Sequence, residues 1–429
     1  MKICKVKGWQ TCIRHDPKTG FTQFKEGDLC IFFPPDAVLP KAIYDDRLGV
    51  GKYLHDLPKD EFGVRPEGKR VVATRLRGMP SYGVITEIDS KWGDDPAWDV
   101  GTDLVEHFGI TKYEPPLEST EGDAEKSSTL FHQYSGPENF GNFPDALVEG
   151  EEVVFTEKIH GKNSRVGYVL EAGEDGLPTW TWMAGSHGVR RKEFVNVTHR
   201  YQLPYLCENC VYEESYEPQI GDVFYLSGKN WRIDEVIEPN PESTEPVRKV
   251  QVTQVDDEGK EVLRRSEYWE PLTDNMKMMI QEILVKEMEE FKGYRGTEPL
   301  SVVVFGEIFG AGVQDMAYGL TKRSFRVFDI AINNKYLDYD VKTDWCIKHR
   351  VEMVPVLYRG PFSVAKLEEY TNGPTTMCDV SQAGKFAGRE GIVVTPVIEV
   401  HYCPKINGRK IIKSVSADYL ARKDGTEYH

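Results

Sequence analysis

The sequence predicts an α+β protein in which a small β-barrel precedes a larger domain of mixed or antiparallel sheets with helices. Two observations lead to this prediction. Residues 1–112 consist of short strand-like runs separated by turns, whereas the later part of the chain alternates strand-like runs with a clear helical pattern. In addition, 429 residues are too many for one small core, so two domains are expected.

The N-terminal strands are indicated by turn residues between apolar runs. Residues 8–15 and the run after the turn at 16–20 predict a hairpin and a further strand. Residues 69–88 supply two more strand-like runs around the turn sequence GMPSYG. A closed barrel suits such short strands because closure removes free edges. Residues 113–139 carry prolines, glycines and acidic side chains with little periodicity, which is typical of a linker.

The larger domain is predicted from apolar runs and one helical repeat. Strands are expected at 150–156, 165–170, 178–184, 300–310, 324–332, 389–396 and 408–416. Between 273 and 291, apolar residues recur at three- and four-residue spacing, so we expect a helix with Thr273 or Asp274 as its N-cap. The methionines of this stripe are interpreted as core residues.

Charge and composition exclude some functions. The net charge of −16, from 53 basic and 69 acidic side chains, argues against a protein that coats nucleic acid without specificity. Residues 401–423 are locally basic, so a phosphate-binding patch is predicted there. The sequence contains no run of 18 apolar residues, so a membrane span is not predicted. Eight scattered cysteines favour reduced thiols over disulfides, so we expect a cytoplasmic protein. We also expect a monomer.

Two other motifs are dismissed. Residues 207–210, CENC, have the spacing of a pair of zinc ligands, but no second Cys or His pair follows at the distance of a zinc finger. Residues 310–319, GAGVQDMAYG, lack the lysine of a phosphate-binding P-loop. Neither a zinc site nor a P-loop ATPase is therefore predicted.

Lys158 is the first candidate for chemistry, since it ends a strand-like apolar run and is followed by a polar turn. A lysine at such a position either extends its amine to solvent or takes part in a reaction. The pattern K-x-x-G is weak evidence by itself, because residues 5–8, 385–388 and 405–408 also fit it. Evidence from other motifs in the chain is therefore needed to choose between the two interpretations of Lys158.

Five motifs occur in one order along the chain. They are EKIHGKN (157–163), VVVFGEIFG (302–310), FRVFDI (325–330), REGIVV (389–394) and GRKIIKSVS (408–416). Together they resemble the covalent nucleotidyltransferase superfamily of polynucleotide ligases and capping enzymes, and K-x-H-G-x-N is similar to its RNA-ligase branch. The N-terminal segment resembles the OB-fold domain of the ATP-dependent RNA ligases of the Deinococcus/Naegleria type. The resemblance implies an OB-fold domain at 1–112, an acidic linker at 113–139 and a nucleotidyltransferase domain at 140–429, with an insertion around 171–270.

The resemblance also assigns roles to residues near the nucleotide. Lys158 would attack ATP and carry AMP, which requires an unprotonated amine; partial burial, a metal ion and nearby cations favour that form. Lys410 and Lys413 would contact phosphates and assist catalysis, although the family commonly has K-x-K where this chain has KIIK. Further nucleotide-binding residues would be Glu157, Ile159, Gly161, Asn163, Glu307 on the ribose, Phe325 stacked on adenine, and Glu390; Glu390 and Glu307 would hold Mg²⁺ or Mn²⁺.

Contacts to nucleic acid are predicted at four further positions. Ser186 and Arg190 lie in a stretch aligned with a motif that contacts the acceptor end, where Ser-His replaces the typical Ser-Arg and Arg190 or Arg191 would supply the cation. Arg75 and Arg77 are candidates for nucleic-acid contacts of the N-terminal barrel. Trp9 is a further candidate, but a core position is the preferred interpretation.

The function implied by the resemblance is ATP-dependent RNA ligation. Lys158 would take AMP, pass it to a 5′-phosphate end, and a 3′-hydroxyl would then displace AMP to seal the strand. The expected partner is RNA in a nicked duplex or an RNA/DNA hybrid. The alternatives are a DNA ligase, a GTP-using capping enzyme, and a non-catalytic sensor that binds RNA ends or nucleotide. The first two usually carry their OB domain after the last motif, which disfavours them here.

Overall fold

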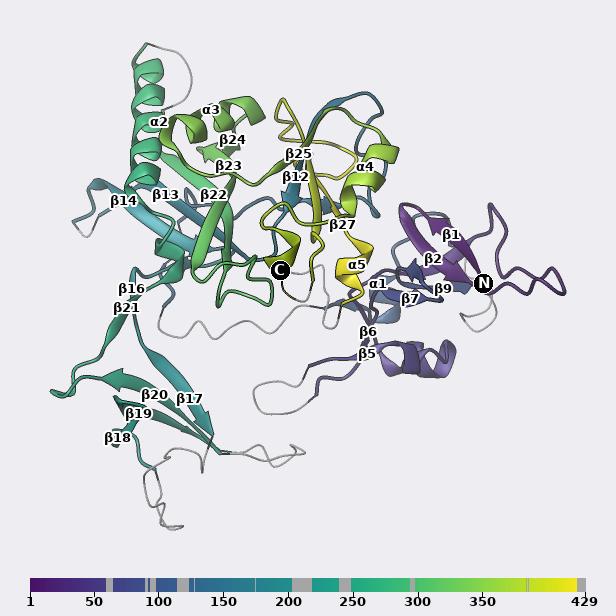
Figure 1. Cartoon of the computed structure of the whole chain (residues 1–429), viewed down its shortest axis with the longest axis horizontal. Helices are drawn as coiled ribbons and strands as arrows, with labels where there is room; N and C mark the ends of the chain where they lie inside the picture. Colours follow the sequence, from purple (N-terminus) through teal and green to yellow (C-terminus); the bar gives the residue numbers. More distant parts are fainter. Residues whose placement is uncertain are drawn as a thin grey trace.

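The structure is a computed structural model that describes all residues except 59–64, 89–91, 93–97, 114–122, 127, 174, 203–217, 239–247, 294–297, 383, 385 and 423–429. It contains two antiparallel-type sheets that form the centre of the molecule, with the N-terminal strands at one side and a separate sheet projecting at the other (Figure 1). The α+β class predicted from the sequence is confirmed.

The larger central sheet has six strands in the order β15-β14-β13-β22-β23-β24, all antiparallel. Its strands are β13 (Lys162–Ala172), β14 (Pro178–Ser186), β15 (Arg190–Arg191), β22 (Ser301–Gly310), β23 (Arg323–Ile332) and β24 (Lys335–Tyr336). β22 is an almost continuous apolar run because both of its faces are covered. The strands predicted at 165–170, 178–184, 300–310 and 324–332 are confirmed.

The second central sheet has five strands in the order β11-β27-β26-β12-β25. They are β11 (Glu138–Asn139), β12 (Glu152–Lys158), β25 (Val356–Pro361), β26 (Gly391–Pro396) and β27 (Ile412–Val415). Only β11 and β27 run parallel to each other. A shared core fills the space between the two sheets and includes Val303, Phe305 and Ala331 of the six-stranded sheet and Ile411 beside β27.

The predicted long helix is α2 (Asp274–Lys292), and the hydroxyl of Thr273 caps it by accepting a hydrogen bond from the Met276 amide. Its methionine and isoleucine stripe packs on the six-stranded sheet, as the sequence interpretation expected. The other helices are α1 (Val105–Phe108), α3 (Tyr339–His349), α4 (Val364–Thr371) and α5 (Ala417–Leu420). Among the described residues, no helix is long and apolar enough to cross a membrane.

The N-terminal segment folds into short paired strands around its own core. The strands are β1 (Lys2–Val6), β2 (Trp9–Ile13), β3 (Cys30–Phe33), β4 (Ala37–Leu39), β5 (His55–Asp56), β6 (Lys69–Arg70), β7 (Thr74–Leu76), β8 (Met79–Ser81), β9 (Val84–Glu87) and β10 (Thr111–Lys112). They pair as β1-β2, β10-β4-β6-β5, β3-β9 and β7-β8, and buried Ile31 and Phe33 of β3 and Leu39 of β4 belong to one core cluster. Closure of these strands into an OB-type barrel stays a prediction.

The N-terminal segment packs directly on the central sheets. The indole nitrogen of Trp9 donates to Asn142 Oδ1 at 2.9 Å, and the Gly141 backbone lies against the Trp9 ring. Arg75, on β7, forms an ion pair with Asp418 of α5. Trp9 is 7 % exposed, so it is a buried residue at this contact, in agreement with its interpretation as a core residue.

The region between β14 and α2 builds two small sheets of its own. β16 (Phe194–Asn196) pairs with β21 (Leu263–Arg265), and a four-stranded sheet has the order β17-β20-β19-β18. Its strands are β17 (Thr198–Gln202), β18 (Val223–Leu226), β19 (Lys229–Ile237) and β20 (Lys249–Val255). This sheet projects from the molecule in Figure 1. Within the predicted insertion at 171–270, β14 belongs to the six-stranded sheet, whereas β16 to β21 form the two separate sheets. The CENC motif at 207–210 lies outside the described residues.

Candidate active site

A cavity of about 230 Å³ lies between the two central sheets. Lys158 and Lys413 line it from the five-stranded sheet, and Glu307 and Phe328 line it from the six-stranded sheet. Lys112, from β10 of the N-terminal segment, lines it as well. Residues from all five predicted motifs and from the N-terminal segment are therefore close to one space.

Lys158 is held next to a buried acid by strand pairing. It is the last residue of β12, and it lies opposite Gly391, the first residue of β26. This register brings Glu390, one residue before β26, to the Lys158 amine, and the two side chains form an ion pair. The Glu390 side chain is 1 % exposed and that of Lys158 17 %. The lysine therefore does not extend freely to solvent, which was the alternative interpretation of its position.

Glu307 faces the same end of the cavity. It lies opposite Asn163 in the β13–β22 pairing, so the first two motifs are neighbours. Burial raises the pKa of Glu307 to about 8; the nearby Glu390 adds to this rise, while Lys158 and the backbone hydrogen bond of Gly161 oppose it. Gly161 is required here because a Cβ would come within 2.2 Å of the Ile308 carbonyl oxygen.

Two neighbours of Lys158 have buried polar side chains with defined partners. The Glu157 carboxylate accepts hydrogen bonds from Thr375 and Thr376. The His160 ring is 2 % exposed; its Nε2 lies 2.7 Å from Asp315 Oδ1 and its Nδ1 lies 2.9 Å from the Tyr419 hydroxyl. These contacts fix the backbone on both sides of Lys158. They agree with the interpretation of His160 as a structural hydrogen-bonding residue.

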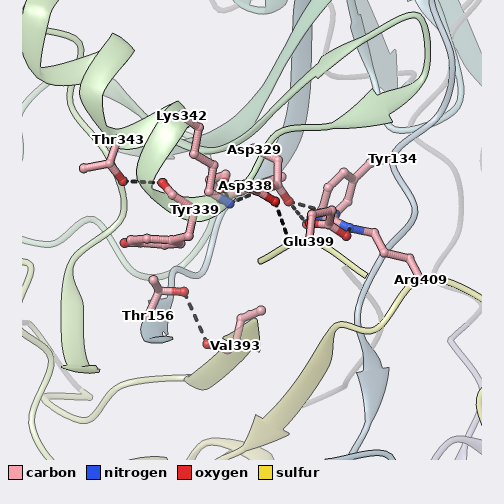
Figure 2. Close-up of polar contacts among 11 residues, drawn as sticks. Tyr134, Thr156, Asp329, Asp338, Tyr339, Lys342, Thr343, Val393, Glu399 and Arg409 are labelled. Atoms are coloured by element: carbon pink, nitrogen blue, oxygen red, sulfur yellow. Dashed lines mark hydrogen bonds and ion pairs between the residues drawn. The ribbon is translucent and has the colours of Figure 1, made fainter. Parts of the chain in front are cut away.

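The opposite end of the cavity contains a second charged group, drawn in Figure 2. The Asp329 carboxylate, 1 % exposed, forms ion pairs with Lys342 and Arg409 and accepts a hydrogen bond from the Tyr134 hydroxyl at 2.6 Å. Arg409 also pairs with Glu399, to which it donates from its Nε and from one terminal nitrogen of the guanidinium group. Burial by itself would raise the pKa of Asp329, but the charges of Arg409 and Lys342 outweigh it and lower the pKa to about 2.

The structure does not bring every predicted residue to the cavity. Lys410 lies in a bend before β27 and forms an ion pair with Glu151 at 2.6 Å, whereas Ile411 and Lys413 line the cavity. Phe325 packs with the core beneath α2, and Phe328 is the aromatic residue of that motif that lines the cavity. These two positions correct the sequence interpretation.

The residues predicted to contact nucleic acid lie in other surroundings. Arg190 pairs with Glu125 and Glu171, and the residue near it that lines the cavity is His187. Ser186 lies at the end of β14, where its hydroxyl is 3.5 Å from the Val189 carbonyl oxygen. Arg77 is exposed in the β7–β8 turn, next to Arg75, which is paired with Asp418. Arg190 and Arg75 are thus engaged in protein contacts.

Among the cavity-lining residues that sequence reasoning missed are three with basic side chains: Lys112, His187 and Lys342. Lys112 and Lys342 belong to none of the five motifs, and only long-range packing brings them to the site. His187 follows the predicted Ser186 directly, so the Ser-His pair itself was the available signal.

Two antiparallel-type sheets with a lysine–glutamate pair between them define a nucleotidyltransferase-type ligase fold, and the comparisons with solved structures agree. A lysine-to-alanine mutant of Naegleria gruberi RNA ligase with ATP and Mn is 18% identical, with a TM-score of 0.58 over 99% of this chain and 94% of that chain. The same ligase with PPi is also 18% identical, with a TM-score of 0.53 over 97% and 91%. A glutamate-to-alanine mutant with AMP and Mn is 17% identical, with a TM-score of 0.55 over 99% and 94%. At these identities the likeness establishes the fold.

The family is established by sequence. The family model described as RNA ligase matches residues 151–415, which is more than half of the chain. The chain belongs to the RNA ligase family. No curated protein matches it by sequence.

Proposed function

We propose that this RNA ligase uses ATP and forms a covalent lysyl-AMP on Lys158 as its first intermediate. The observation that carries the proposal is the buried ion pair of Lys158 with Glu390 at a cavity between the sheets, next to Glu307 and Lys413. The solved structures of Naegleria gruberi RNA ligase with ATP and Mn, AMP and Mn, and PPi support the choice of nucleotide, because they share this fold.

In the first step the Lys158 amine attacks the α-phosphorus of ATP. A nitrogen–phosphorus bond forms, the bond to the β-phosphate oxygen breaks, and pyrophosphate leaves. The amine has to be free of its proton and of Glu390 at that moment. Strand pairing at the end of β12 fixes the direction of the side chain, and such positioning contributes much of the rate in phosphoryl-type transfers.

Other residues of the cavity suit the remaining parts of a nucleotide. Lys413 and Lys112 place positive charge where phosphates would lie, and Phe328 offers a ring for stacking on the base. We retain Glu307 as the partner of the ribose hydroxyls, since a carboxyl group accepts hydrogen bonds from hydroxyls. Phe328 takes the role that the sequence had suggested for Phe325.

Glu390 and Glu307 are the residues that would hold Mg²⁺ or Mn²⁺. The rise in the pKa of Glu307 next to Glu390 fits this assignment, because a partly buried and a buried carboxylate side by side repel each other and a cation relieves that repulsion. When bound, the ion would neutralise charge on the phosphates. Two carboxylates, together with phosphate oxygens and water molecules, are sufficient ligands for Mg²⁺.

The later steps transfer AMP to a 5′-phosphate end and seal it with a 3′-hydroxyl. We propose RNA in a nicked duplex or an RNA/DNA hybrid as substrate, with residues 1–112 as an OB-fold domain, 113–139 as a connecting segment and 140–429 as the transferase domain. Because Arg75 and Arg190 are paired with acids, we look for the strand contacts at Lys112 and His187, which line the cavity, and at Ser186, which precedes His187. A panel of nicked and single-stranded RNA and DNA substrates tests this choice.

The central experiment is adduct formation with ATP labelled at the α-phosphate. The wild-type protein should become labelled after denaturing electrophoresis, and Lys158→Ala should not, while its unfolding curve stays unchanged. Lys335→Ala, an exposed lysine of β24, is the matched control and should be labelled normally. An unlabelled wild-type protein would favour the nucleotide or RNA-end sensor, and preferential labelling by GTP would favour a capping enzyme.

A further inference from the structure

One short turn forms hydrogen bonds with the residue before Lys158 and with the residue before Glu390. The turn consists of residues 373–376, which follow α4. On one side it holds Glu157, the residue before Lys158: the hydroxyls of Thr375 and Thr376 donate to the Glu157 carboxylate, and the Thr376 amide donates to it at 2.8 Å. Glu157 is 1 % exposed, so these three donors satisfy a buried charge-bearing group.

On its other side the same turn holds Arg389, the residue before Glu390. The Arg389 guanidinium group donates to the Pro374 carbonyl oxygen at 2.9 Å and to that of Tyr370 at 3.1 Å. The Arg389 backbone amide donates to the Gly373 carbonyl oxygen at 2.9 Å. Gly373 has φ +125°, and its missing Cβ leaves room for the guanidinium group, which would lie 3.2 Å from that Cβ.

These contacts lie just beyond the end of the β12–β26 strand pairing, which positions Lys158 but does not include Glu390. The β12–β26 pairing ends with Lys158 opposite Gly391, so Glu390 is one residue beyond it. From the β27 side, the Ser416 amide donates to the Glu390 carbonyl oxygen at 2.8 Å. On the remaining side, the turn joins the residue before Lys158 to the residue before Glu390.

We propose that residues 373–376 are a positioning element for adenylate transfer, with Thr375 and Thr376 as its positioning residues. By holding Glu157 and Arg389 together, the turn fixes the relative direction of the Lys158 amine and the Glu390 carboxylate. The inference rests on the proposed function of Lys158 as nucleophile. Its importance for rate follows from the chemistry, since a displacement of about 1 Å at a reacting group costs on the order of a hundredfold in rate.

The test measures single-turnover adduct formation over a range of ATP concentrations in the full-length protein. Thr376→Val removes one hydroxyl donor at an exposed position, and Thr375→Val removes a buried one. We expect the rate constant at saturating ATP to fall at least about tenfold, as for lost hydrogen bonds to a charged group, while the half-saturating ATP concentration changes less than about twofold. Thr376→Ser restores the hydroxyl and should recover most of the rate.

Thr371→Val is the matched control. Its hydroxyl is also buried and hydrogen-bonded, to the Leu367 carbonyl oxygen and to Ser414, but it does not contact Glu157. It should lower stability to a similar degree and leave the rate constant near wild type. The proposal is overturned if the Thr376 variants slow the reaction only in proportion to their unfolded fraction, or if Ser and Val behave alike. A wild-type protein that forms no adduct would instead overturn the function on which the inference rests.

Discussion

The two ends of the cavity use the same kinds of side chain with opposite results. At one end, Glu307 and Glu390 lie near Lys158, and the pKa of Glu307 is raised to about 8. At the other end, Asp329 lies between Lys342 and Arg409, and its pKa is lowered to about 2 (Figure 2). Burial raises the pKa of both carboxyl groups, and the difference arises because the two cations beside Asp329 outweigh burial whereas Lys158 beside Glu307 does not.

This difference suits the proposed roles of the two groups, the first in the reaction and the second in the stability of the fold. Asp329 and Glu399 are matched by two cations, and a balanced buried network holds its geometry without a ligand. Where Glu307 and Glu390 meet, burial and mutual repulsion exceed the effect of Lys158, so bound positive charge would be favourable. Perturbed acids of this kind are frequent at functional sites. We expect substitutions at the two ends to affect different measurements.

The largest effect is expected for Glu390→Gln. The neutral amide removes the charge that pairs with Lys158 and the proposed metal ligand, so the rate of adduct formation should fall by at least about a hundredfold. Its stability should fall less than that of Asp329→Asn, because the single amine left unpaired is partly exposed and the repulsion with Glu307 is removed. Single-turnover labelling and urea unfolding measure the two quantities. Near-normal labelling would show that Glu390 has no part in the reaction.

Asp329→Asn should give the converse result. It leaves Lys342 and Arg409 facing a neutral group in a buried position, which costs about 3–5 kcal/mol of unfolding free energy. Asp340→Asn is the control: its pair with Arg359 is exposed, so the loss should stay below about 1 kcal/mol. Urea unfolding at neutral pH distinguishes them. Equal losses in the two variants would mean that the Asp329 network does not stabilise the fold.

The same carboxylate predicts an acid dependence of stability. The pKa of Asp329 is about 2 in the folded protein against an ordinary value of 3.8. A lowered pKa stabilises the fold above pH 3.8, and this contribution, about 2 kcal/mol, is lost as the pH falls from 3.8 through 2. Urea unfolding of the wild type across this range should be steeper in pH than that of Asp329→Asn. Parallel curves for the two proteins would contradict the assignment.

The sequence was sufficient to predict the centre of the fold, and it led to the proposal that Lys158 and Glu390 take part in the reaction. Strands such as β22 are recognisable because they are apolar over their whole length, and α2 because its apolar residues repeat every three or four positions. Lys158 was singled out because a lysine at the end of a buried-looking strand is unusual, and Glu390 was proposed from its place in the ordered motifs. The family match over residues 151–415 agrees with that interpretation.

The sequence interpretation differed from the structure where a residue's role depends on the side of the sheet to which its side chain points. Lys410 and Phe325 belong to the expected motifs, yet each points away from the cavity while Lys413 and Phe328 line it. The alternation of side chains along a strand was available as a signal, but it could be applied only once one residue of each strand was placed. Lys112 could not be predicted, because its position depends on how the N-terminal segment packs against the sheets.

The smallest effect is expected for Lys410→Ala, and it tests this assignment of faces. Lys410 pairs with Glu151, which also accepts a hydrogen bond from the Val148 amide, so its removal should cost about 1 kcal/mol or less and change the labelling rate less than about twofold. Lys413→Ala removes positive charge that lines the cavity and should slow labelling at least about tenfold. Both variants are measured with the single-turnover assay under one set of conditions. If Lys410→Ala slows labelling as much as Lys413→Ala, the two lysines act together on phosphates and the Lys410–Glu151 pair is not the state in which the reaction occurs.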